Sequence, residues 1–118
     1  MFKLAPDGTL AVLHEFTGGS DGGFPVDGLI ADGSGNLYGM TASGGIGDCV
    51  DGTLVGCGIA FKFTPDGTET VLYSFDDNNN GGYYPSDGPL LLDKHGNLYG
   101  TNFYGGANGN GTIFEIKN

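Results

Sequence analysis

The segment from Asp76 to Asp87 carries side chains spaced like the ligands of a calcium loop. Asp76, Asn78 and Asn80 alternate along the chain, Gly81 follows at the sixth position, and Asp87 stands at the twelfth. Calcium binds several oxygen ligands on a tightly turned loop, which this spacing provides. The twelfth residue is not the usual Glu, and no helical pattern flanks the loop. The sequence therefore predicts a calcium site at Asp76, Asn78, Asn80 and Asp87, with a polar loop between strands as the alternative.

Two cysteines, Cys49 and Cys57, enclose a short segment rich in glycine. A disulfide between them would close a surface loop, as is common in exported proteins, because an inserted loop has no core to hold it. The sequence therefore predicts a Cys49–Cys57 disulfide, with two free thiols in a cytosolic protein as the alternative. A zinc site would need more ligands, and His14 and His95 lie in unrelated positions.

Three tyrosines, Tyr83, Tyr84 and Tyr104, lie beside glycine turns. Aromatic rings near Asp and Asn side chains bind sugars by stacking and hydrogen bonding. Packing between neighbouring sheets is the other interpretation of the same rings. The sequence therefore marks these tyrosines as candidate glycan-binding residues.

Catalytic motifs are weak in this chain. It contains no Gly-x-Ser-x-Gly motif, and neither histidine stands in a recognisable relay. With fourteen acidic residues, some carboxylates must lie close together, so a pair alone does not indicate a glycosidase. Asp32 and Asp93 recur in matching turns, which favours a structural role. A carbohydrate-active hydrolase or lyase using carboxylates on a propeller face remains the rival to a non-enzymatic protein.

The elements that must position these residues come from an internal repeat. Residues 2–16 read FKLAPDGTLAVLHEF and residues 61–75 read FKFTPDGTETVLYSF, while DGSGNLYG at 32–39 returns as DKHGNLYG at 93–100. Residues 111–117 begin a third, partial copy. A period of about sixty residues is typical of propellers, solenoids and arrays.

Each repeat reads as two hairpins and hence four short strands. Pro-Asp-Gly turns join the strands of one hairpin, and Asp-x-x-Gly-Asn turns join those of the other. Residues 28–32 are predicted as the innermost strand, 36–41 as the second, 58–64 as the third and 69–75 as the outermost. The fold class is therefore all-β, with tandem four-stranded antiparallel sheets like β-propeller blades and two repeats per chain. The recurring apolar positions are expected to form the core: Phe2, Leu13, Leu29, Leu37, Tyr38, Phe61, Leu72, Leu90, Leu98, Tyr99 and Phe114.

The Asp-x-x-Gly-Asn-Leu-Tyr-Gly hairpin and the Phe-Lys-x-x-Pro-Asp-Gly-Thr turn together resemble the GloVer-type propeller-like repeats of extracellular bacterial proteins. The resemblance covers nearly the whole chain and is carried by both copies. It implies a secreted or cell-surface location and no established activity. One departure is an insertion, Asp48–Gly56, that the second repeat lacks.

Composition narrows the possible partners. Four lysines and fourteen acidic residues give a net charge of −10, which excludes a basic groove for nucleic acid and attraction to an anionic membrane. Twenty-five glycines fit many tight turns, and eight Phe and six Tyr argue against disorder.

The sequence thus predicts a single β-repeat domain, residues 1–118, made of repeat one (1–60, with the insertion) and repeat two (61–118, with a closing strand). Its expected function is an extracellular, non-enzymatic scaffold or binding module. The chain begins inside a repeat unit, so we expect either further repeats of a longer protein or a homo-oligomer. Strand exchange between copies would give a ring of three or four chains, or a fibre, because propellers need about four to eight blades.

The calcium prediction is tested by thermal unfolding. We expect millimolar calcium, and not magnesium, to raise the melting temperature, because the ion would offset repulsion among the acidic side chains. The variant Asp76→Ala should lose this response. A melting temperature that calcium leaves unchanged, or that it shifts equally in the variant, contradicts the site.

Overall fold

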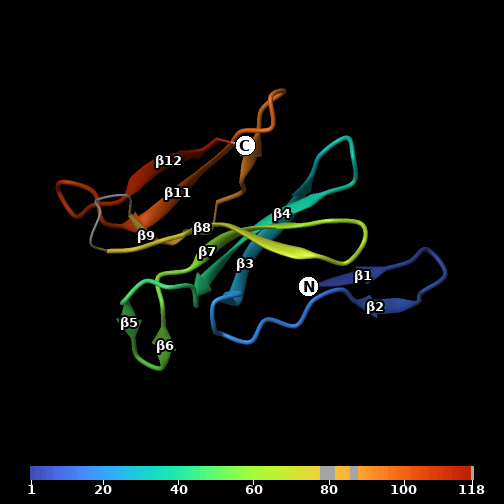
Figure 1. The fold of residues 1–118 in the computed structure, drawn as a ribbon, viewed down its shortest axis with the longest axis horizontal. Helices are drawn as coiled ribbons and strands as arrows, with labels where there is room; N and C mark the ends of the chain where they lie inside the picture. Colours follow the sequence, from blue (N-terminus) through green and yellow to red (C-terminus); the bar gives the residue numbers. More distant parts are fainter. Residues whose placement is uncertain (78–81, 86–87, 118) are drawn as a thin grey trace.

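The regular structure of the chain consists of short strands. The computed structural model describes residues 1–77, 82–85 and 88–117, and within these ranges it contains no helix (Figure 1). No helix in that part of the chain is therefore available to cross a membrane. The prediction of an all-β chain is confirmed. The strands are β1 Phe2–Leu4, β2 Leu10–Val12, β3 Gly23–Ala31, β4 Leu37–Ser43, β5 Val50–Asp51, β6 Leu54–Val55, β7 Ile59–Phe63, β8 Glu69–Ser74, β9 Tyr83–Pro85, β10 Leu91–Leu92, β11 Leu98–Tyr104 and β12 Thr112–Ile116.

The first sheet is antiparallel and has the order β3-β4-β7-β8. This is the strand order that the sequence predicts for one repeat. β3 carries an irregularity between Val26 and Ile30, where the register shifts against β4. The insertion between β4 and β7 forms its own small hairpin, β5-β6, outside the sheet.

The second sheet repeats the first with two differences, one of which is that no described strand takes the place of β8 beside β12. β11 and β12 take the places of β4 and β7, and β9 and β10 together take the place of β3 along the edge of β11. Tyr83 lies opposite Tyr104 as Gly23 lies opposite Ser43, and Leu91 lies opposite Tyr99 as Ile30 lies opposite Tyr38. The paired residues of the two sheets can therefore be matched, with one extra residue in the second repeat between β9 and β10.

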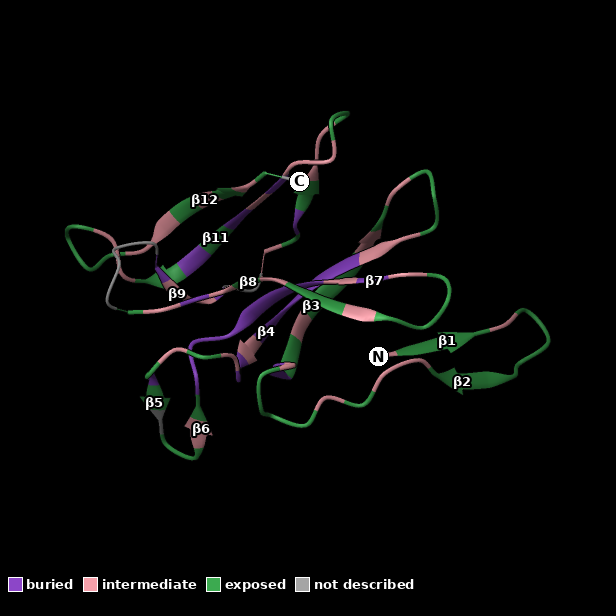
Figure 2. Cartoon of the chain, in the orientation of Figure 1, coloured by how far each residue is buried: buried purple, intermediate pink, exposed green. Residues whose placement is uncertain are grey.

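The N-terminal hairpin, β1-β2, lies apart from both sheets (Figure 1). Its cross-strand pairs Phe2–Val12 and Leu4–Leu10 place four apolar side chains on one face. All four are between 59% and 66% exposed, and Figure 2 shows both strands in the colour of exposed residues. The prediction that Phe2 lies in the core is wrong, because β1 pairs with β2 and with no third strand among those described.

The Asp-x-x-Gly-Asn turns owe their shape to one carboxylate each. In the first turn, Asp32 accepts hydrogen bonds from the backbone N–H of Ser34 and Asn36, at 2.9 and 3.0 Å. It also accepts them from the Asn36 side chain at 2.8 Å and the Tyr38 hydroxyl at 3.0 Å. These bonds explain the Asp, the Asn and the Tyr of the repeated motif.

Asp93 makes the same four bonds in the second turn, with His95, Asn97 and Tyr99 as donors. The Tyr99 hydroxyl also lies 3.0 Å from Glu115, and this bond, with the one to Asp93, raises the pKa of Tyr99 to about 12. The recurrence of the whole set supports the structural interpretation of Asp32 and Asp93 over the catalytic one.

The core lies between the two sheets. Tyr38, Met40 and Ala60 of the first sheet pack with Leu90 and Leu98 of the second, and all five are at most 3% exposed. The buried part of β4 and β7 is the central band of Figure 2.

The core prediction holds in part. Tyr38, Phe61, Leu90 and Leu98 are buried, and Leu13, Leu37, Leu72, Tyr99 and Phe114 are partly buried. The assignment of Leu29 is wrong, because this side chain is 39% exposed on the side of the first sheet that faces away from the second.

The turn carboxylates predict how stability depends on pH. Hydrogen bonds, the largest from the Asn36 side chain for Asp32 and from the Asn97 backbone for Asp93, hold the pKa of each at about 2, against an ordinary 3.8. A depressed pKa means that the folded state favours the charged form. The stability that these groups contribute is therefore complete above about pH 4 and is lost as the pH falls toward 2.

The measurement is chemical unfolding as a function of pH. Wild type should lose stability between about pH 4 and pH 2, and the double variant Asp32→Asn/Asp93→Asn should be less stable at pH 7 with a flatter response to acid. Asp48→Asn, whose residue is outside both turns, serves as control. Equal acid responses in the wild type and the double variant would contradict the assignment.

Candidate binding site

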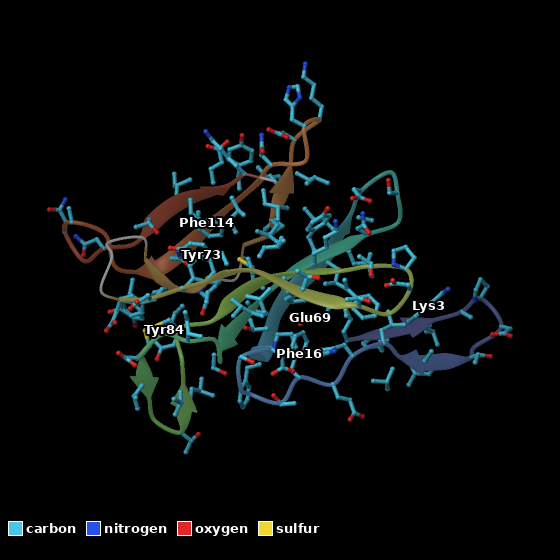
Figure 3. All side chains as sticks on the ribbon, viewed as in Figure 1. Lys3, Phe16, Glu69, Tyr73, Tyr84 and Phe114 are labelled. Carbon is cyan, nitrogen blue, oxygen red and sulfur yellow. A yellow bond between two sulfur atoms is a disulfide. The ribbon has the colours of Figure 1, made fainter. Side chains whose placement is uncertain are left out.

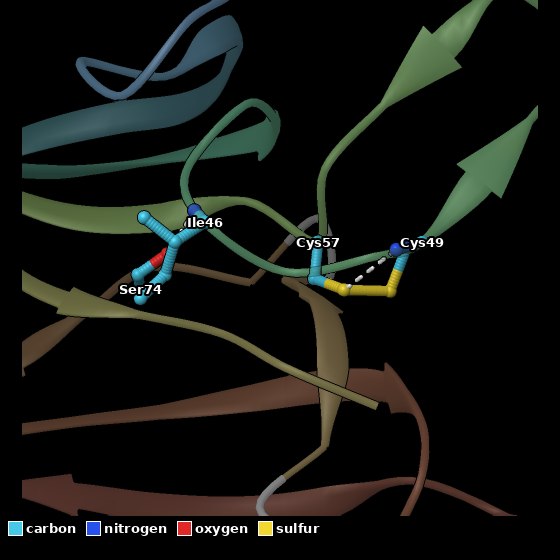
Figure 4. The surroundings of a disulfide bond; sticks show 4 residues. All are labelled: Ile46, Cys49, Cys57 and Ser74. Carbon is cyan, nitrogen blue, oxygen red and sulfur yellow. Dashed lines mark hydrogen bonds between the residues drawn. A yellow bond between two sulfur atoms is a disulfide. The ribbon is translucent and has the colours of Figure 1, made fainter. Parts of the chain in front are cut away.

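The inserted loop is closed by a disulfide between Cys49 and Cys57, whose Cα atoms are 4.9 Å apart (Figure 4). The bond confirms the pairing predicted from the sequence, and both cysteines are buried. The Cys49 N–H points at the Cys57 Sγ at 3.3 Å, and the Gly56 N–H donates to the Cys49 carbonyl at 2.8 Å. The loop therefore has a defined shape at its base.

Glycine is required at the base of this loop. Gly56 has a φ of +89°, and a Cβ there would lie 2.2 Å from the carbonyl oxygen of Gly44. The Ile46 N–H also donates to the Ser74 hydroxyl at 2.8 Å, which ties the loop to β8 (Figure 4). The inserted segment is thus packed against the first sheet by backbone contacts that no larger residue would allow.

The loop also contacts the second sheet. The Tyr84 N–H donates to the Cys57 carbonyl at 3.2 Å, so β9 lies alongside the disulfide. Tyr83 and Tyr84 pack on the core cluster that contains both cysteines. The insertion therefore forms one wall of a space whose other wall is the edge of the second sheet.

An open pocket of about 300 Å³ lies in this space, and the three candidate tyrosines line it. Tyr83 and Tyr104, which face each other across β9 and β11, are stacked with centroids 5.7 Å apart and planes 29° apart. Tyr84 meets Tyr83 at 5.4 Å and Tyr104 at 6.0 Å, in both cases edge to face. The structure thus brings together the three residues that the sequence marks, although Tyr104 is 21 residues from Tyr83.

Two carboxylates share the pocket with the tyrosines. Asp48 comes from the inserted loop and Asp77 from the segment after β8, and the residues lining the pocket are Asp48, Cys49, Val50, Asp77, Tyr83, Tyr84 and Tyr104. Both carboxylates are exposed. Sequence reasoning missed these two residues, because only the folded loop brings them beside the rings. Flat aromatic surfaces with acceptors at their rim suit a ligand that carries both C–H faces and hydroxyl groups.

The backbone at Tyr84 is in the left-handed region, with a φ of +51°. Such a value is rare for a bulky residue and often marks a functional site. Phe24, the matching residue of the first sheet, has the same φ of +51° but lies outside the pocket. The conformation is therefore a property of the repeat, and it does not by itself indicate a ligand.

Three of the four residues of the predicted calcium site, Asn78, Asn80 and Asp87, lie outside the residues that the structure describes. Asp76 is described and partly buried. Asp77 gathers with Cys49 and Cys57 within 4.8 Å, but the two sulfur atoms are bonded to each other and do not serve as metal ligands. The calcium site therefore stays a prediction.

A second polar cluster lies in the segment between β2 and β3. The His14 Nε2 is 3.3 Å from Asp21, which also accepts a bond from the Thr17 N–H at 3.0 Å. Partial burial acts to raise the pKa of Asp21, but the hydrogen bonds from Thr17 and His14 outweigh it and lower the pKa. Burial raises the pKa of Glu69 nearby. Sequence reasoning did not pair His14 with Asp21. Because Asp21 bonds to His14 and Thr17, the cluster fits the role of fixing the shape of the segment between β2 and β3.

The comparisons with known proteins identify one relationship. The model of one protein family, described as the Gloeobacter/Verrucomicrobia repeat, matches residues 1–118. No curated protein and no solved structure matches the chain.

The disulfide predicts a measurable contribution to stability. Replacing both cysteines (Cys49→Ser/Cys57→Ser) should lower the free energy of unfolding by about 2–3 kcal/mol, the loop-closure entropy of a nine-residue loop. Urea unfolding with and without reductant measures the difference. The reductant should destabilise the wild type by the same amount and leave the double variant unchanged. Free thiol in unreduced protein by mass spectrometry would contradict the bond.

Proposed function

The chain belongs to the Gloeobacter/Verrucomicrobia repeat family, and from this membership and the site above we propose that it is an extracellular, non-enzymatic β-repeat module that binds glycans. Its four-stranded sheets then act as propeller-like blades that hold the binding loops. The disulfide supports an oxidising compartment outside the cell, where such bonds persist. The observation that carries the proposal is the gathering of Tyr83, Tyr84 and Tyr104 in one open pocket.

The pocket suits a sugar for two physical reasons. Aromatic rings cover the apolar C–H face of a pyranose, and carboxylates accept hydrogen bonds from its hydroxyl groups. Tyr104 is 45% exposed, so part of its ring is accessible to a ligand. Asp48 and Asp77 stand at the same pocket as acceptors. A neutral sugar fits best, because a net charge of −10 repels acidic polysaccharides.

The pocket also exists because of the inserted loop. The first repeat carries the insertion, and its disulfide base meets Tyr84 of the second repeat. A repeat scaffold acquires binding specificity through loops that depart from the common pattern, since the common pattern is occupied with packing. The insertion is the part of repeat one that repeat two lacks, and it supplies Asp48 to the site.

Glycan binding is tested with the intact chain and a panel of neutral oligosaccharides, by titration followed with NMR. We expect Tyr104→Ala to weaken binding about twofold to twelvefold, since an aromatic contact contributes roughly 0.5–1.5 kcal/mol. Phe24→Ala is the matched control, because Phe24 has the backbone conformation of Tyr84 but lies outside the pocket. No binding across the panel, or equal binding by the Tyr104 variant, would contradict the proposal.

The rival function is tested in the same samples. Release of reducing sugar ends from a bound oligosaccharide, abolished by Asp48→Asn or Asp77→Asn, would identify a hydrolase in place of a binding module. Products with an unsaturated ring would identify a lyase. We expect the oligosaccharides to be recovered intact.

Self-association through strand exchange is the second part of the proposal. β7 is bonded to β4 on one side and β8 on the other, whereas its counterpart β12 is bonded to β11 alone among the described strands. β2 lies in residues 2–16, at the place that β8 takes in the matching residues 61–75. An open strand edge pairs readily with a compatible strand. β2 of one copy would therefore pair with β12 of another.

Deletion of residues 1–12 tests this exchange. It removes β1 and β2 but leaves Phe16, which packs on Phe61 of the first sheet. We expect light scattering to show an oligomer for the full chain and a weaker or absent oligomer after the deletion. An assembly that the deletion leaves unchanged would show that the exchanged strand is not the contact.

A further inference from the structure

The two sheets of the chain pack against each other through different faces, as the matched residues show. We call the side of each sheet that carries Leu29 or its counterpart Leu90 the front face, and the opposite side the rear face. The rear face of the first sheet, with Met40 and Ala60, packs on the front face of the second, with Leu90 and Leu98. The chain therefore contains one complete front-to-rear interface.

The front face of the first sheet is only partly covered. Leu29 is 39% exposed, whereas Leu90 at the matching place is 3% exposed. Pro25 is exposed, whereas Pro85 is buried against the first sheet. A groove of about 490 Å³ runs along this face between Phe2 on one side and Leu29 and Phe61 on the other. The groove is apolar. On the second sheet, the corresponding part of the front face is covered by the first sheet.

The rear face of the second sheet is exposed to solvent, whereas the rear face of the first sheet is covered. Ile113 is 83% exposed, whereas Ala60 at the matching place in the first sheet is fully buried. Thr101 is exposed where Met40 is 2% exposed. Leu91 and Phe103 on the same face are 66% and 62% exposed. Exposed apolar side chains gathered on one sheet face usually mark a contact surface.

One aromatic contact occurs at both front faces with the same geometry. Phe75, after β8, meets Phe114 of the second sheet at 5.1 Å and 62°. Phe16, after β2, meets Phe61 of the first sheet at 5.2 Å and 61°. Figure 3 shows Phe114 close to the β8 segment that carries Tyr73, and Phe16 beside the first sheet. The first sheet is thus approached from its front by the same type of segment that approaches the second, which indicates that both front faces are built for the same kind of neighbour.

We propose that the front face of the first sheet binds the rear face of the second sheet of another copy of this chain. The contact repeats between chains the packing that joins the two sheets within one chain. It is heterologous, so each copy uses one face to bind and offers the other, and the assembly closes into a ring or continues as a fibre. The occupant is a second copy because this chain itself carries the exposed rear face that matches the partly covered front face.

This inference rests on the self-association proposed above and names its surfaces. A second sheet placed on the front face would bring its β12 beside the N-terminal hairpin. β1 is bonded only to β2 among the described strands, so the hairpin can move without breaking a sheet. β1 pairs with β2 in the register in which β7 pairs with β8, so β12 of the second copy would take the place of β1 on β2. Face contact and strand exchange therefore belong to one arrangement, but they depend on different residues.

Two charge substitutions test the faces, with light scattering and sedimentation as readouts. Leu29→Asp places a charge on the front face and Ile113→Asp places one on the rear face. Both positions are solvent-accessible, so each variant should fold, and circular dichroism checks this. We expect each variant alone to be a 12.1 kDa monomer under conditions in which the wild type assembles. Val55→Asp, at a position 62% exposed in the inserted loop, should assemble like the wild type.

Mixing the two variants gives the sharper result. Leu29→Asp retains an intact rear face and Ile113→Asp an intact front face, so the mixture should form a heterodimer of about 24 kDa, twice 12.1 kDa, and nothing larger. Phe103→Asp, a second rear-face variant, should behave as Ile113→Asp does.

Three outcomes overturn the inference. These are a wild type that stays monomeric at millimolar concentration, face variants that assemble like the wild type, and a mixture that stays monomeric. Loss of assembly on deleting residues 1–12, with no effect of the face variants, would leave strand exchange standing and reject the face contact. Glycan binding is measured separately and is unaffected by either result.

Discussion

The structure depends on a carboxylate that closes a five-residue turn. Asp32 and Asp93 each accept two backbone and two side-chain hydrogen bonds, from donors within six residues along the chain. The Tyr hydroxyl in this set belongs to the strand that follows, so the turn fixes both the reversal of the chain and the direction in which the Tyr ring leaves the sheet. In the first repeat that ring is Tyr38, which lies in the core. A hydrogen bond within the turn thereby positions a side chain that packs in the core.

The second constraint comes from glycine, because a residue without a side chain leaves room for neighbouring side chains to lie over its strand. A Cβ at Gly39 would lie 2.6 Å from the Phe61 ring and 2.7 Å from Leu29, and a Cβ at Gly100 would lie 2.5 Å from the Phe114 ring and 3.1 Å from Leu90. The ring of the third strand therefore lies over the glycine of the second strand in both sheets. This arrangement presents a flat aromatic surface on each front face, against which the Phe from the preceding segment packs.

The candidate site lies where the two repeats differ in sequence. The insertion, with its disulfide, comes from repeat one, while Tyr83 and Tyr104 of repeat two replace Gly23 and Ser43 of repeat one. Aromatic residues at these matched places leave less room for close backbone packing and create ring surfaces instead. The positions that depart from the repeat therefore lie together in space, beside a scaffold whose other positions are committed to turns and packing.

The sequence by itself predicted the repeated hairpins, the strand order of the first sheet, the turns and the disulfide, because each depends on residues close in the chain or on a repeated pattern. It did not predict β5, β6 and β9, nor that β3 begins at Gly23. It marked the three tyrosines, but the pocket that joins them to Asp48 and Asp77 required the folded insertion. Tertiary structure alone decided burial. Phe2 and Phe61 share one motif, as Leu29 and Leu90 share another, yet Phe2 and Leu29 are exposed while Phe61 and Leu90 are buried. The physical reason is that burial depends on the neighbouring sheet, and similar local sequences have different neighbours.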